Sequence, residues 1–161
     1  MPALLQGLPP VIARNTRVLI LGSFPGVASL SAQQYYAHPR NHFWTVLGEI
    51  LGEPLVDIPY RQRLMRLRAH RVGVWDTIVA CERQGSLDSA IRNALQGEVA
   101  RITRVARDLR AVCFNGVTAA RAESYWREAG FATLRLPSTS PAYTRPLSDK
   151  ITAWQSLAQW L

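Results

Sequence analysis

The sequence predicts an α/β fold, a three-layer α/β/α sandwich on a four-stranded, mostly parallel sheet. Four short apolar runs recur along the chain, and segments with helical spacing separate them. Strands that alternate with helices pair in parallel through right-handed crossovers. With 161 residues, 48% of them hydrophobic, the chain can bury a core, so we expect a single domain over residues 1–161.

The first three apolar runs are nearly continuous, as expected of strands that are covered on both faces. They comprise residues 18–21, 72–75 and 111–114. The fourth run, residues 132–136, alternates more, so we expect it at an edge. Ligands of open parallel sheets bind just outside the carboxyl ends of the strands. The loops after the first, second and fourth strands are therefore the places to look for chemistry.

The segments between the strands carry apolar residues at helical spacing. The predicted helices cover residues 43–51, 58–70, 87–95, 99–109 and 118–129, and Ser148 is placed to cap a last helix. Pro59 stands in a first turn, where proline is tolerated. Gly130 follows the fifth helix as a common stop signal.

The charge is strongly basic, with a formal net charge of +8. Lys150 is the only lysine, so nearly all the positive charge is arginine. Arginine binds phosphate through a planar fork of donors and stacks on bases. The balance suits a polyanionic partner such as nucleic acid, although a charge that only aids solubility fits it as well.

Several classes of protein are disfavoured. Cys81 and Cys113 stand far apart without CxxC partners, which argues against a zinc site. The first loop is no P-loop, because it lacks the lysine of that motif. No apolar run approaches the ~20 residues of a membrane helix, and the first residues do not resemble a signal peptide. We therefore expect a cytoplasmic monomer that has no membrane partner, metal or organic cofactor.

The most informative stretch is a tight turn after the first strand and the aromatic segment that follows it. The turn has the sequence GSFPG, residues 22–26, and its successive amides can form an anion-binding nest. In the following segment, Asn41 offers both a donor and an acceptor, and it can hold a water. Phe43 or Trp44 can stack on a nucleobase, although core packing of a helix explains them too.

The loop after the fourth strand combines small hydroxyl residues with prolines. Hydroxyl and amide groups of Ser138, Thr139 and Ser140 suit phosphate oxygens of a DNA backbone. The apolar tip at Pro141, Ala142 or Tyr143 can wedge into a base stack.

Four motifs stand in the order GSFPG, AHPRNHFW, CFNG and LPSTSP. In this order they resemble the uracil-DNA glycosylase superfamily, which has a four-stranded parallel sheet with active-site motifs at the strand ends. The chain is most similar to the branch of hypoxanthine (deoxyinosine) DNA glycosylases, in which GSFPG, YYAHPxNxFW and LPSTSPA segments occur together. The resemblance covers about residues 18–144.

The resemblance implies a repair enzyme that flips a deaminated base, most simply hypoxanthine, out of DNA and hydrolyses its N-glycosidic bond. It assigns the positioning of the attacking water to Asn41. The implied base-binding residues are Gly22, Ser23, Phe24, Pro25, Gly26, Phe43, Trp44, Asp76 and Asn115. The implied DNA contacts are His38, Arg40, Ser138, Thr139, Ser140, Pro141, Ala142, Tyr143 and Arg145.

Asp76 follows the second strand, where some relatives carry an asparagine that reads a pyrimidine. An ionised aspartate only accepts hydrogen bonds, so Asp76 suits a base with an N–H such as N1–H of hypoxanthine. Helix capping or an ion pair with an arginine explains it equally well.

Two other functions stay open. The first is excision of uracil from mismatches, but Phe24 and Leu136 replace polar residues of the mismatch-specific uracil enzymes. The second is a catalytically idle α/β module that binds nucleic acid. We expect no lysine in the site, and hence a monofunctional hydrolase without a Schiff-base step.

Overall fold

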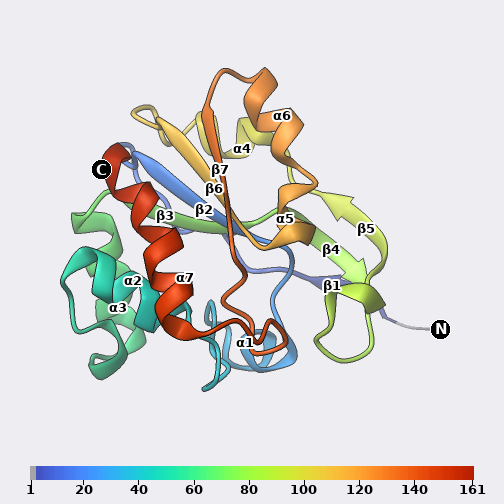
Figure 1. Ribbon diagram of the computed structural model, residues 1–161. Coiled ribbons are helices and arrows are strands. Elements are labelled where there is room, and N and C mark those ends of the chain that lie inside the picture. Colours follow the sequence, from blue (N-terminus) through green and yellow to red (C-terminus); the bar gives the residue numbers. More distant parts are fainter. Residues whose placement is uncertain (1–2) are drawn as a thin grey trace.

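The centre of the fold is a parallel sheet of four strands in the order β3-β2-β6-β7. The computed structural model describes residues 3–161 (Figure 1). The strands are β2 (Val18–Gly22), β3 (Val72–Asp76), β6 (Ala111–Asn115) and β7 (Ala132–Leu136). All three pairings are parallel, which confirms the predicted sheet and the edge position of β7.

The register aligns the carboxyl ends of the strands. Gly22 pairs with Asp76, and Asn115 pairs with Leu136. Strands β2, β3 and β6 are buried along their whole length, because helices cover both faces of the sheet. The residues that the motifs place after the strands therefore meet at one edge.

Helices form the outer two layers of the predicted sandwich (Figure 1). One face carries α2 (Phe43–Leu51), α3 (Tyr60–Ala69) and α7 (Leu147–Trp154). The other carries α4 (Val99–Thr103), α5 (Val117–Ala120) and α6 (Glu123–Glu128). A short helix, α1 (Val27–Ala32), follows the first loop, and 3₁₀ turns cover Leu55–Asp57 (η1), Asp88–Ala90 (η2) and Gln155–Trp160 (η3).

The predicted helix over residues 87–95 is wrong. Residues after η2 form the strand β5 (Arg92–Gln96), which pairs antiparallel with β4 (Ile78–Glu82). With β1 (Leu5–Gln6) they build a second sheet in the order β1-β4-β5. The apolar spacing suggested a helix with a buried face, but β5 is exposed along its whole length. A short apolar pattern by itself does not distinguish a helix from a strand.

Two other predicted helices are shorter than expected. The segment 99–109 is α-helical only to Thr103, and the segment 118–129 divides into α5 and α6. Gly130 adopts a positive φ of 99° just beyond α6, as a stop residue should. Within residues 3–161, no helix has the length and apolar character needed to cross a membrane.

Candidate active site

Three strand ends and one aromatic residue converge at the carboxyl edge of the sheet. The Asn115 amide Nδ2 donates to the Tyr36 hydroxyl at 3.2 Å. A Cβ placed on Gly22 would lie 2.5 Å from Asp76 Oδ1 and 2.9 Å from the Tyr36 hydroxyl oxygen. Only glycine at position 22 lets these two polar groups approach the strand so closely.

Asp76 is the buried acid of this cluster. Its side chain is 5% exposed, and its Oδ2 has no hydrogen-bond partner within residues 3–161. Burial above all, and the nearby Asp88, raise the pKa of Asp76 to about 7, although Arg83 acts in the opposite direction. Buried polar atoms almost always have partners, so this carboxylate oxygen is a candidate acceptor for a hydrogen bond from a water or a ligand. The pKa lets Asp76 change its charge near neutral pH.

The raised pKa of Asp76 makes the free energy of unfolding depend on pH. In the unfolded chain this carboxyl ionises near 3.8, so between that pH and about 7 the folded state binds more protons. The free energy of unfolding should therefore decrease as pH rises through this window, because the buried carboxyl must lose its proton. The total decrease is about 4 kcal/mol, at ~1.36 kcal/mol per unit of pKa. Denaturant unfolding of wild type and Asp76→Asn measures the effect. An equal pH slope in both proteins would contradict it.

Tyr36 is the aromatic residue that the structure brings to the site. Its φ of 54° is in the left-handed region, which residues other than glycine seldom adopt outside turns and functional sites. Its ring stacks on Phe43 with centroids 3.9 Å apart, and burial raises the pKa of its hydroxyl. Sequence reasoning did not single out Tyr36, although it stands within the aromatic segment.

Phe43 and Trp44, the two predicted stacking residues, lie in the core. Phe43 is fully buried, and Trp44 is 4% exposed with its indole N–H bound to the Tyr35 carbonyl. Both belong to the cluster beneath α2 and α7, because the first turn of α2 faces the sheet. This placement corrects their assignment as base-contacting rings and leaves Tyr36 as the ring beside Gly22.

Asn41 is held rigidly just before α2. Its Oδ1 accepts the N–H of Phe43 at 2.9 Å, and its own N–H donates to the His38 carbonyl at 3.0 Å. A carboxamide oxygen has two acceptor positions, so one of them remains for a water. The local turn therefore fixes the orientation of the Asn41 side chain and leaves one acceptor position of its oxygen unused.

The first loop presents free amides. Its carbonyls at Gly22 and Ser23 accept from Thr77 and Ile78, at 2.8 and 3.0 Å. Within residues 3–161, the amides of Ser23, Phe24 and Gly26 donate to no protein group. The Phe24 side chain is buried against Ile78 and Cys81, so its contribution to the site comes from the backbone.

Arg83 holds this loop from beneath and was missed by sequence reasoning. The Arg83 guanidinium donates to the Pro25 carbonyl at 2.6 Å and to the Gly85 carbonyl at 2.7 Å. It also lies 5.1 Å from the centre of the Phe24 ring. The Ser23 hydroxyl donates to Asp88 at 2.7 Å, so the segment around η2 also contacts the first loop.

The loop after β7 is fastened to β6 by one buried residue. The Thr139 N–H donates to Asn115 Oδ1 and its Oγ1 accepts from Asn115 Nδ2, both at 3.0 Å. The Thr139 carbonyl accepts the His42 N–H at 3.0 Å. These bonds correct the assignment of Thr139 to DNA contacts, because its polar groups are used inside the protein. They also join the loop to the segment that carries Asn41.

Replacement of Asn115 by Leu should loosen this connection. The Thr139 N–H and Oγ1 would stay buried without partners, and an unsatisfied buried group costs ~1–3 kcal/mol. We expect a lower denaturant midpoint. Asn15→Leu, at an exposed position, is the matched control, and equal midpoints for the two variants would contradict the prediction.

The other predicted DNA contacts lie at the surface. Ser138 Oγ accepts the Ser140 N–H, and Ser140 Oγ accepts the Ala142 N–H, which shapes an exposed tip. This tip comprises Pro141, Ala142 and Tyr143. Arg40 and Arg145 are exposed, and the ring of His38 accepts the Arg40 N–H at 3.1 Å. Arg145 Nε is 3.7 Å from Asp149.

Lys150, the only lysine of the sequence, lies beside the loop after β7. Lys150 is fully buried, and its Nζ donates to the carbonyls of Tyr143 at 2.8 Å and Ser140 at 3.4 Å. Nζ is also 3.5 Å from His42 Nδ1, and burial lowers the pKa of both groups. Helix α7 packs on α2, so a residue distant in sequence reaches the loop. Lys150 fastens the loop after β7.

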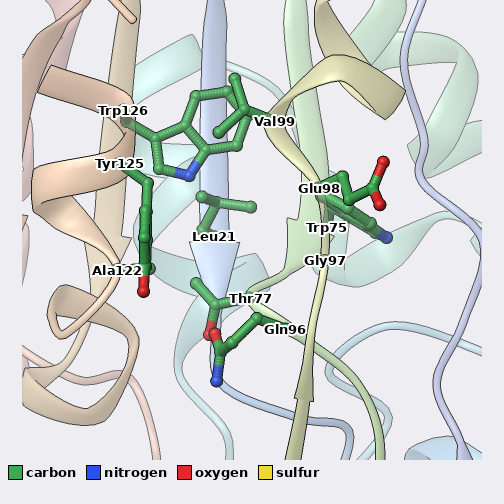
Figure 2. Close-up of a pocket in the computed structure, with 10 residues that line it drawn as sticks. All are labelled: Leu21, Trp75, Thr77, Gln96, Gly97, Glu98, Val99, Ala122, Tyr125 and Trp126. Carbon is green, nitrogen blue, oxygen red and sulfur yellow. The ribbon is translucent and has the colours of Figure 1, made fainter. Parts of the chain in front are cut away.

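A hollow of about 350 Å³ opens on the face of the sheet that α4 and α6 cover. Figure 2 shows the rings of Trp75, Tyr125 and Trp126 around Leu21. A more polar hollow of about 630 Å³ adjoins it at Thr77, Gln96 and Tyr125. Gly22, Tyr36, Asp76 and Asn115 line neither hollow, but Asp88, whose charge acts on Asp76, lines the second one.

Comparison with known proteins bears on this arrangement. A family model described as the uracil DNA glycosylase superfamily matches residues 9–158. A protein of Methanosarcina barkeri named hypoxanthine DNA glycosylase is 40% identical and covers 92% of this chain and 94% of its own length. A protein of the same name from Methanosarcina acetivorans is 38% identical over 94% of this chain and 96% of its own length.

Two further proteins are similar. A G/U mismatch-specific uracil DNA glycosylase of Schizosaccharomyces pombe is 33% identical over 63% of this chain and 30% of its own length. The NMR structure of a candidate uracil DNA glycosylase from Methanosarcina acetivorans has a TM-score of 0.88 and 36% identity, and the match covers 98% of both chains.

Proposed function

Because this chain belongs to the uracil DNA glycosylase superfamily, we propose that it releases hypoxanthine from deoxyinosine in DNA by hydrolysing the N-glycosidic bond. The observation that carries the proposal is its likeness to two relatives named hypoxanthine DNA glycosylase, along almost the full length of each. The substrate is DNA, and the net charge of +8 suits that polyanion. We further propose that the enzyme acts as a monomer.

Catalysis in this proposal depends on positioning and charge. Enzymes that act on a stacked base flip the nucleotide into the protein. Asn41 Oδ1 would hold a water for attack on C1′ of the sugar as the bond to the base lengthens. Its bond to the Phe43 N–H supports this role, because it fixes the direction of the remaining acceptor position. The DNA phosphates and oriented dipoles stabilise the developing positive charge on the sugar.

The flipped base would lie against Tyr36, with its edge toward the first loop and Asp76. The free amides of Ser23 and Phe24 are donors suited to O6 of hypoxanthine, and Asp76 is an acceptor suited to N1–H. Arg40, Arg145 and the tip at Pro141 would contact the DNA around the lesion. Lys150 already donates to loop carbonyls, so water remains the nucleophile.

Tyr36→Leu should reduce the single-turnover rate of base release by about 10- to 100-fold, because stacking contributes ~1–3 kcal/mol per base. Tyr36→Phe keeps the ring but loses the hydroxyl that Asn115 contacts, so it should stay within a few-fold of wild type. Gel-based assays of both variants measure this. Equal rates for the two would show that the ring of Tyr36 does not contact the base.

A second candidate function is excision of uracil from mismatches. The similarity to the Schizosaccharomyces pombe enzyme favours it. Two observations count against it, because Phe24 points into the core and Leu136 is apolar where the mismatch-specific enzymes carry polar groups.

A base-release assay tests the proposal. Labelled oligonucleotides with one inosine, uracil or xanthine are incubated with excess enzyme, and alkali then cleaves any abasic site. Cleavage mainly at inosine supports the proposal. Cleavage mainly at uracil overturns it in favour of the second candidate. Tight DNA binding without cleavage at any of the three bases would favour an idle binding module.

A further inference from the structure

We propose that Asp76 is the residue that rejects adenine, because its ionised carboxylate offers no donor to the unprotonated N1 of that base. The inference rests on the proposed function and goes beyond it. It assigns to one side chain the discrimination between the deaminated base and its normal parent.

The position of Asp76 is set by the sheet. It ends β3 in register with Gly22, the residue that precedes the free amides of the first loop. Its Oδ1 lies 2.5 Å from the position that a Cβ on Gly22 would take, and its Oδ2 is buried without a partner within residues 3–161. A carboxylate acceptor and a loop with backbone amides that are unpaired among the described residues therefore stand at the ends of adjacent strands.

This pair of groups matches hypoxanthine and mismatches adenine. Hypoxanthine presents a carbonyl at O6 and an N–H at N1, which pair with the amides and the carboxylate. Adenine presents an amino group at position 6 and a lone pair at N1, so both positions are reversed. A site built around buried polar groups rejects a base that leaves those groups unpaired.

The discrimination should depend on the charge of Asp76. A protonated carboxyl is both a donor and an acceptor, so it can pair with N1 of adenine as well. Since the pKa of Asp76 is about 7, a large part of the protein carries the neutral form below that pH. Selectivity for hypoxanthine over adenine should therefore increase with pH.

Other groups around Asp76 set where this change occurs. Asp88, on η2, raises its pKa, and Arg83, after β4, lowers it. Tyr35 and Tyr36 face it from the aromatic segment, and both hydroxyls have pKa values raised by burial, so they stay neutral across the relevant range. Asp88→Asn should move the midpoint of the selectivity change to lower pH, an effect that a merely structural role of Asp76 does not produce.

The experiment measures binding of two uncleavable duplex oligonucleotides. One carries 2′-fluoroarabino-inosine and the other 2′-fluoroarabino-adenosine, each opposite an abasic site so that neither base is paired. Affinity is determined for wild type, Asp76→Asn and Asp88→Asn between about pH 6 and about pH 8.5, which brackets the pKa of Asp76. For wild type, the preference for inosine should rise by about tenfold or more, since one pKa unit corresponds to ~1.36 kcal/mol. Asp76→Asn should show a smaller preference that does not change with pH.

The outcomes separate this inference from the proposed function. If Asp76→Asn keeps the wild-type preference and its pH dependence, or if Asp88→Asn leaves the midpoint in place, the inference is overturned. Release of hypoxanthine from an ordinary inosine oligonucleotide is measured in parallel. Its absence at every pH would overturn the proposed function, whatever the binding data show.

Discussion

Asn41→Ala should slow hypoxanthine release by about 10²- to 10³-fold, the usual loss when one positioned polar group of an active site is removed. The water would lose the acceptor that holds it near C1′. DNA binding should stay within a few-fold of wild type, because the exposed arginines Arg40 and Arg145 are unchanged. Single-turnover base release and DNA affinity, measured on the same preparation, check both expectations.

The Ala variant also removes the acceptor of the Phe43 N–H at the start of α2, which can cost ~0.5–2 kcal/mol of stability. Asn41→Ser is the matched control. The serine hydroxyl oxygen can still accept that N–H, but the shorter side chain does not reach the position of the attacking water. We expect it to unfold near the wild-type midpoint and to remain slow. If Asn41→Ser regained most of the wild-type rate, Asn41 would matter for the helix start and not for the water.

Gly22→Ala should damage the site more broadly. The added Cβ would lie 2.5 Å from Asp76 Oδ1 and 2.9 Å from the Tyr36 hydroxyl, in a strand buried on both faces. Overpacking of this kind costs ~1–3 kcal/mol, and a displacement of about 1 Å in an active site can cost ~10²-fold in rate. We expect a lower denaturant midpoint together with a rate loss of that size.

Gly26→Ala is the control from the same loop. A Cβ at that position meets only the Ser86 side chain at 3.4 Å or more, which is an ordinary contact. It should keep near wild-type stability and rate. If both variants lost stability and rate equally, the close approach of Asp76 and Tyr36 to Gly22 would not be the cause of the loss in Gly22→Ala.

The local sequence was enough to predict the parallel sheet. Strands β2, β3 and β6 are short and buried on both faces, and that environment produces near-continuous apolar runs. The motif residues at the strand ends followed from the same pattern, because parallel strands bring their carboxyl ends to one edge. Helix α2 has the predicted bounds, since its apolar residues repeat with helical period.

The local sequence led to a wrong prediction at the exposed strand β5, where a helix was expected. Leu95 has helical spacing from Leu87 and Ile91, but it lies on an exposed strand whose partner, β4, is formed by residues to which no strand was assigned. The antiparallel sheet depends on pairing between segments, and no periodicity within either segment shows that pairing.

The sequence by itself determined the family motifs, the parallel sheet and the placement of Gly22, Asp76 and Asn115 at the carboxyl ends of its strands. Only the tertiary structure decided which aromatic ring lies beside Gly22 and that Thr139 forms hydrogen bonds inside the protein. It also brought Lys150 next to His42, which is 108 positions away in the sequence. It also placed Arg83 beneath the first loop. The physical reason is that strand burial leaves a local pattern in the chain, whereas hydrogen bonds between distant loops depend on how the layers pack.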